Sequence, residues 1–244
     1  MSEEIAAKCR LLEEMVKEFE GRTRAFQMSR YEADDEALNL MQLACRNVTG
    51  VITLARTSLK LLPPAEVAAR AAYEASVKAA WMLAPADPYD REARWTTHLS
   101  GEVDFLDKQI REGTDLGIDM TRARERRDVL DQFGNDVAQL LRQKGYATKG
   151  RSPIPQMLID IGERRTYGLY SQLCETAHGG HSATWIFRSG GVGSKKVRGE
   201  FITDSKWDLP LAIARFVFKC PVLLLYERFG LDSDNLRRLI GPIT

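Results

Sequence analysis

The chain has few of the residues that build metal centres or disulfide frameworks, with 3 His and 4 Cys among 244 residues. The cysteines stand singly and far apart, at Cys9, Cys45, Cys174 and Cys220, and each neighbours aliphatic or aromatic residues as buried thiols usually do. Such isolated thiols are typical of a reducing compartment, so we expect a cytoplasmic protein.

An excess of charge of one sign is also missing, because 35 Lys and Arg against 34 Asp and Glu give a formal net charge of +1. No overall field draws the chain to nucleic acid or anionic lipid, so a charged partner must find a local patch. The first fourteen residues contain four Glu and lack the basic start and apolar run of a secretory signal. Arg215, Lys219 and Pro221 interrupt the most apolar stretch, residues 209–226, so we expect no membrane partner.

Nucleotide and hydrolase motifs are absent too. Residues 190–198, GGVGSKKVR, are basic and glycine-rich, but Lys and Ser or Thr do not directly follow the second glycine as in a Walker loop. The chain has no Gly-x-Gly-x-x-Gly fingerprint and no Gly-x-Ser-x-Gly elbow. We therefore predict no cofactor, and interpret 190–198 either as a solvated loop or as a flap that contacts a polyanion.

What the chain does have is helical periodicity over most of its length. We predict helices over 3–20, 35–62, 65–83, 89–112, 120–144 and 207–229, with short ones near 150–162, 167–178 and 232–240. The fold class is all-α, a multi-helix bundle with a small β-hairpin or ordered loop near residues 183–203, where two short β-type runs, 184–188 and 200–203, are separated by glycines and basic residues. We expect one domain over 1–244, formed by an N-terminal helix and connection (1–33), a helical core (34–180), the insertion (181–206) and C-terminal helices (207–244).

The helix predicted over 65–83 carries the first candidate residues. Arg70 and Glu74 are spaced i, i+4, and Trp81 falls inside the same arc of the helix while the opposite side is almost wholly apolar. A purely solvated face would not normally carry a Trp in its middle, which predicts that the helix is covered on both sides and that Arg70 and Glu74 are partly buried. A solvated salt-bridge ladder is the alternative.

A second candidate face lies on the predicted helix 167–178. Tyr167, Tyr170, Cys174 and His178 recur at helical spacing and share one side. His178 stands at the helix end, before Gly179 and Gly180, where an imidazole could serve as acid, base or anion contact. The alternative is a C-terminal His that only caps carbonyl groups.

Glu175, His178 and His181 form Glu-x-x-His-x-x-His, which has metal-ligand spacing on a helix. Di-iron bundles need such a pair on two helices, and the two glycines take His181 off this one, so we predict no metal. Trp81, Tyr170 and His181 are predicted ligand-binding residues, and Arg70, Glu74 and His178 are predicted catalytic candidates.

Across residues 65–180 a set of positions resembles a bacterial helical family of unknown function that is similar to the HEPN superfamily. The positions are Arg70-x-x-x-Glu74, Trp81, Pro85, Arg91, Tyr170-x-x-Leu173 and His178. The resemblance implies a compact, often dimeric helical domain from a superfamily that contains metal-independent ribonucleases of toxin-antitoxin and phage-defence systems, alongside members without catalysis.

That superfamily's nuclease motif is Arg, four to six residues, then His, which adds Arg91 and His98 as candidates because six residues separate them. His178 has no Arg at the required distance. Three functions therefore remain open. The chain is a binding or interaction protein that forms a homo-oligomer or docks a protein partner, a metal-independent ribonuclease that acts on RNA, or a small-molecule binder with a helical cleft.

Overall fold

The structure, a computed structural model, describes residues 1–24, 26, 29–148, 152–187 and 202–241. Within these residues the fold is all-α, as predicted. The α-helices are α1 (Glu3–Thr23), α2 (Glu32–Thr57), α3 (Leu62–Leu83), α4 (Pro88–Asp115), α5 (Thr121–Gln143), α6 (Ile154–Asp160), α7 (Tyr167–Ala177), α8 (Asp208–Val217), α9 (Leu223–Arg228) and α10 (Asp234–Ile240).

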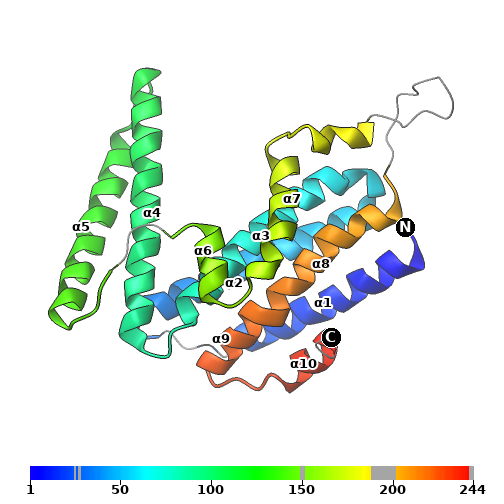
Figure 1. Cartoon of the computed structure of the whole chain (residues 1–244), viewed down its shortest axis with the longest axis horizontal. Coiled ribbons are helices and arrows are strands. Elements are labelled where there is room, and N and C mark those ends of the chain that lie inside the picture. Colours follow the sequence, from blue (N-terminus) through cyan, green and yellow to red (C-terminus); the bar gives the residue numbers. More distant parts are fainter. Residues whose placement is uncertain (25, 27–28, 149–151, 188–201, 242–244) are drawn as a thin grey trace.

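The third helix forms the centre of the molecule, with α2, α7 and α8 packed around it (Figure 1). It begins at two prolines, Pro63 and Pro64, whose missing N–H groups are not needed in a first turn. Six of its 13 buried residues are alanines, which let neighbouring backbones approach closely. The prediction that this helix is covered on both sides is confirmed.

Helix boundaries follow local capping chemistry. The Asp87 carboxylate accepts the Tyr89 N–H at 2.7 Å, and Asp87 is therefore the N-cap of α4. The second helix ends at Thr57 rather than at residue 62, because Ser58 is extended and its hydroxyl accepts the Lys60 N–H. A 3₁₀ turn, Leu59–Leu61, then leads into α3.

The predicted kink at Pro221 is a π-helical turn, Phe218–Val222, between α8 and α9. A proline has no N–H for the helical ladder and its ring crowds the preceding turn, which favours such a widened turn. Phe218, Pro221 and Val222 are buried there, so the turn packs against the core.

Helices α4 and α5 form an antiparallel pair on one side of the body (Figure 1). Trp95 of α4 contacts Phe133 of α5 edge to face, and Asp107 of α4 pairs with Arg127 of α5. These contacts join the two helices at two points along their length. Helix α5 packs mainly on α4.

The predicted β-type run 184–188 is wrong over its described part, since Ser182–Phe187 is a 3₁₀ helix. The N–H of Ala183 bonds the Gly180 carbonyl and that of Thr184 bonds the His181 carbonyl, so the chain leaves α7 in further i, i+3 turns. Residues 188–201, which include the basic glycine-rich stretch and the start of the second predicted run, lie outside the described residues.

One segment of the described chain, Asp204–Arg228, is long and apolar enough to cross a membrane by length and composition. Its most apolar window is 56% buried inside the protein, as the core helix of a soluble protein also is. The expectation that the chain has no membrane span therefore stays a prediction.

Candidate functional site

Side chains from α3 and α7 meet in one polar cluster at the surface of the body. The Arg70 Nε donates to the Glu74 Oε1 at 2.9 Å, and the Tyr170 hydroxyl donates to the same oxygen at 2.9 Å. The Arg70 Nη1 lies 3.2 Å from the His178 Nε2. The structure thus brings together the three predicted catalytic candidates and one predicted ligand-binding residue.

The cluster is partly buried, which excludes a purely solvated ladder. The side chains of Arg70 and Glu74 are 20% and 31% exposed. Tyr73, fully buried on α3, stacks on Tyr170 with ring centroids 5.5 Å apart and hydrogen-bonds the Thr166 hydroxyl before α7. These ring contacts fix α7 on α3 and so hold Tyr170 over Glu74.

The protonation of the cluster follows from its contacts. Partial burial opposes the charge on Arg70, but the Glu74 carboxylate and Tyr170 outweigh it and raise the pKa of the guanidinium. Burial, together with the nearby Glu74 carboxylate, raises the pKa of Tyr170 far above its usual range. Tyr170 therefore keeps its proton and acts as a hydrogen-bond donor.

His178 is the C-cap residue of α7, and its backbone N–H bonds the Cys174 carbonyl. Gly179 follows with a φ of 63°, the left-handed conformation that ends many helices. His178 therefore occupies the predicted position at the helix end and also contacts Arg70. Because a guanidinium can only donate, a hydrogen bond from Arg70 places the proton of a neutral His178 ring on Nδ1.

A cavity of about 330 Å³ opens beside this cluster, between α3, α4, α6 and α7. Arg70, Glu74 and Tyr170 lie on one side, and His98 of α4 also lines it. His98 is mostly buried, with Nε2 3.6 Å from the Glu36 Oε1 on α2. Other residues that line the cavity include Lys78, Phe105, Ile154 and Met157.

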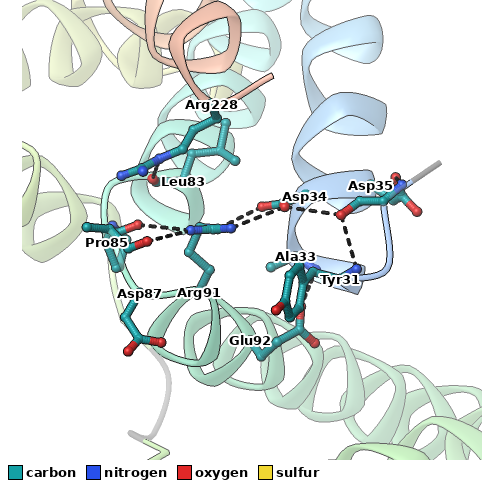
Figure 2. A network of polar contacts seen from close by, with 12 residues as sticks. Tyr31, Ala33, Asp34, Asp35, Leu83, Pro85, Asp87, Arg91, Glu92 and Arg228 are labelled. Carbon is teal, nitrogen blue, oxygen red and sulfur yellow. Dashed lines mark hydrogen bonds and ion pairs between the residues drawn. The ribbon is translucent and has the colours of Figure 1, made fainter. Parts of the chain in front are cut away.

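Arg91 lies elsewhere, in a buried network between α2 and α4 (Figure 2). Its guanidinium donates to both Asp34 oxygens, at 2.7 and 3.2 Å, and to the carbonyls of Pro85 and Ala86. These contacts use four of the five N–H groups of the side chain. Arg91 and His98 therefore have separate acidic partners on α2. Arg91, a candidate through the nuclease motif, connects parts of the fold instead.

Trp81 does not join the Arg70 cluster. Its indole N–H donates to the Asp160 carboxylate of α6 at 2.9 Å, and the Arg94 guanidinium lies 5.0 Å from the ring centroid. Burial lowers the pKa of Arg94. These residues line a neighbouring cavity of about 540 Å³, which shares Thr97, Ser152 and Pro153 with the first.

His181 is exposed beyond the end of α7. Within the described residues there is no group of three or more His, Cys, Asp or Glu side chains that could hold a metal ion. The Glu175, His178 and His181 pattern therefore does not form a ligand set in this part of the chain.

No protein-family model, curated protein or solved structure matches the chain. The resemblance to HEPN-like proteins stays a prediction.

Sequence reasoning missed several residues of these cavities. Lys78 continues the Arg70 and Glu74 stripe at i, i+4 spacing, and that spacing was a usable signal. Arg94 and Asp160 gave no such signal, because they meet Trp81 from two other helices. Phe105 is an exposed aromatic on α4 that lines the cavity only because α4 packs beside α3.

Proposed function

We propose that the protein is a helical binding protein whose 330 Å³ cavity receives a ligand with an anionic group, phosphate or carboxylate, and an apolar body. The observation that carries this proposal is the preorganised Arg70 guanidinium. Glu74 fixes its Nε, while its Nη1 lies at the exposed His178. A guanidinium held in this way loses little side-chain freedom when it binds an anion.

The rest of the cavity supports the same class of ligand. Lys78 lies two helical turns from Arg70 on α3, and no carboxylate among the described residues forms an ion pair with it. Phe105, Ile154 and Met157 offer apolar surface next to these charges. Small-molecule sites combine such apolar walls with a few fixed polar groups.

Thermal unfolding of the purified protein with phenyl phosphate and with phenylacetate tests this function. Ligand binding to the folded state raises the Tm by an amount that grows with the logarithm of ligand concentration over Kd. We expect a rising Tm with at least one probe, and Arg70→Ala to weaken its affinity about 10-fold or more, roughly 1.4 kcal/mol. Arg70→Lys should restore only part of this affinity, because an ammonium lacks the planar fork.

The matched control is Arg127→Ala, which removes an arginine from an exposed ion pair on α5. It should leave the affinity for either probe unchanged. Millimolar probe that leaves the Tm of the unmodified protein unchanged contradicts the proposal, and so does equal binding by the Arg70→Ala variant.

The 3.2 Å approach of Arg70 to His178 favours a second candidate, the metal-independent ribonuclease. A guanidinium beside an imidazole can stabilise phosphate charge while the ring moves the 2′-hydroxyl proton, and His98 lies on the same cavity. Here the Nε2 lone pair of His178 already accepts from Arg70, so that bond must break before the ring acts as a base.

Incubation of the protein with total RNA in EDTA tests this second candidate. Cleavage that survives chelation and is lost in His178→Ala or His98→Ala supports it, with Gln172→Ala on the exposed side of α7 as control. Intact RNA at micromolar protein concentration removes it.

A further inference from the structure

Helix α5 has an apolar stripe that the described part of the chain leaves largely exposed. Of its 23 residues only Ala138 and Leu141 are buried, both on the side that faces α4. Val129 and Leu140 are 68% and 58% exposed, and Phe133, whose ring meets Trp95 of α4 edge to face, is still 45% exposed. Exposed aliphatic and aromatic side chains in one stripe mark an interaction surface more often than scattered single residues do.

The spacing of this stripe is that of a coiled-coil seam. Val129 and Phe133 are four residues apart, and Leu140 follows seven residues after Phe133. In a heptad with Phe133 and Leu140 at a positions, Val129 and Asp136 occupy d positions and Arg126 occupies an a position. The seam therefore has an apolar centre, Val129 and Phe133, with Arg126 before it and Asp136 after it along the helix.

The charges decide how a second copy fits. In an antiparallel pair of α5 helices, a residues face d residues, so Val129 faces Phe133 of the second copy and Arg126 faces its Asp136. Both pairings share one two-fold axis beside Asp131, and each occurs twice. A parallel pair would instead place Arg126 against Arg126 and Asp136 against Asp136, which is unfavourable.

Arg126 is available for this contact, because it forms no ion pair within the described residues. Among the same residues, Asp136 accepts a hydrogen bond only from Gln132, one turn earlier on the same helix. We propose that the chain forms a two-fold symmetric dimer through an antiparallel α5–α5 seam centred on Val129 and Phe133. The α4–α5 pair stands to one side of the body (Figure 1), and Val129 and Leu140 of α5 are exposed there.

The test is the mass of the full-length protein by light scattering coupled to size exclusion, supported by sedimentation equilibrium. The unmodified chain should have twice its sequence mass, and Val129→Glu should give a monomer at the same concentration. Val129 is chosen because it is more exposed than Phe133 and has no ring contact with Trp95, so the substituted chain should fold.

Charge reversal tests the antiparallel register. Arg126→Asp and Asp136→Arg should each raise the dissociation constant about 10-fold or more, whereas the chain with both changes should recover dimerisation because the opposed charges are exchanged. The matched control is Asp128→Arg, which makes the same change of charge on an exposed side of α5 away from the stripe. It should leave the mass unchanged.

A monomeric unmodified chain overturns the proposal. A dimer that persists in Val129→Glu also overturns it, since the interface then lies elsewhere. Failure of the doubly reversed chain to recover excludes the antiparallel seam. A stable complex with another protein through α5, at the expense of the dimer, would assign the surface to that partner and likewise reject this inference.

Discussion

Arg91 carries a positive charge into the interior, where the Asp34 carboxylate pairs with it. Asp34 supplies two oxygens from α2, and the carbonyls of Pro85 and Ala86 accept from Nη1 (Figure 2). Removal of one partner from such a pair leaves the other charge buried and uncompensated. The residue therefore links α2 to the start of α4.

Asp34→Ala should destabilise the fold by about 3 kcal/mol, because it leaves the Arg91 guanidinium buried without its carboxylate. Urea unfolding followed by circular dichroism measures the loss as a lower midpoint at unchanged slope. Asp107→Ala, which breaks the exposed ion pair to Arg127, should cost less than about 1 kcal/mol. Equal losses in the two variants would contradict the structural role of the buried pair.

Residue-scale prediction from sequence succeeded only where the partners share a helix. Arg70 and Glu74 are four residues apart, so their pairing follows from helix geometry alone. His178 was recognised as a candidate from its place at a helix end, but its contact with Arg70 depends on how α7 packs on α3. The bond from Arg91 to Asp34 joins residues 57 positions apart, and periodicity contains no information about it.

At the scale of elements, the contact of α2 with α3 depends on small side chains. The buried alanines of α3 face a second helix that carries Gly50, whose missing Cβ would lie 3.9 Å from the Cβ of Ala68. That distance is an ordinary van der Waals contact. The two helices are therefore close, yet they leave room for one methyl group at this point.

Gly50→Ala should stabilise the protein by up to about 1 kcal/mol, because alanine favours the helical backbone and the new methyl group meets no clash. Ala72→Leu, at a fully buried position of α3, should instead destabilise it by about 1–3 kcal/mol through overpacking. Thermal unfolding of the two variants shows whether the Tm rises in the first and falls in the second. A loss of stability in Gly50→Ala would show that the two helices approach more tightly than this geometry implies.

The helices themselves were predictable because each has an apolar stripe of helical period, and prolines or capping residues mark several of the ends. The stripe alone does not say which neighbour covers it. Helix α5 was predicted over nearly its observed bounds, but only the structure shows that α4 covers one side and leaves Val129 and Leu140 exposed. The run 184–187 failed because β-type composition over so few residues does not exclude a 3₁₀ helix.

At the scale of the whole molecule, two partly buried carboxyl groups link stability to pH. Burial raises the pKa of Glu66, against the opposing effect of its hydrogen bond from Thr176. Burial likewise raises the pKa of Glu92, although its carboxylate accepts the Ala33 N–H. A carboxyl group with a folded-state pKa above its unfolded value contributes stability at low pH and loses that contribution as the pH rises through the folded pKa.

Glu66→Gln should therefore raise the Tm at pH 8 relative to the unmodified protein, and the gain should disappear below the ordinary carboxyl pKa of 4.5. The measurement is a series of thermal unfolding curves between these pH values. Glu112→Gln, at an exposed position of α4, should show no such dependence. A gain that stays constant down to low pH would assign the effect to packing instead of ionisation.

The widened turn at Phe218–Val222 also sets the rotational phase of the C-terminal region. A π-helical turn holds one more residue than the α-helical turn it replaces, so it rotates all that follows by about 100° about the helix axis. Leu225 and Tyr226 face inward in this phase. Loss of a single residue from the turn would bring other side chains of α9 to the interior, so chain length here is under the same constraint as side-chain identity.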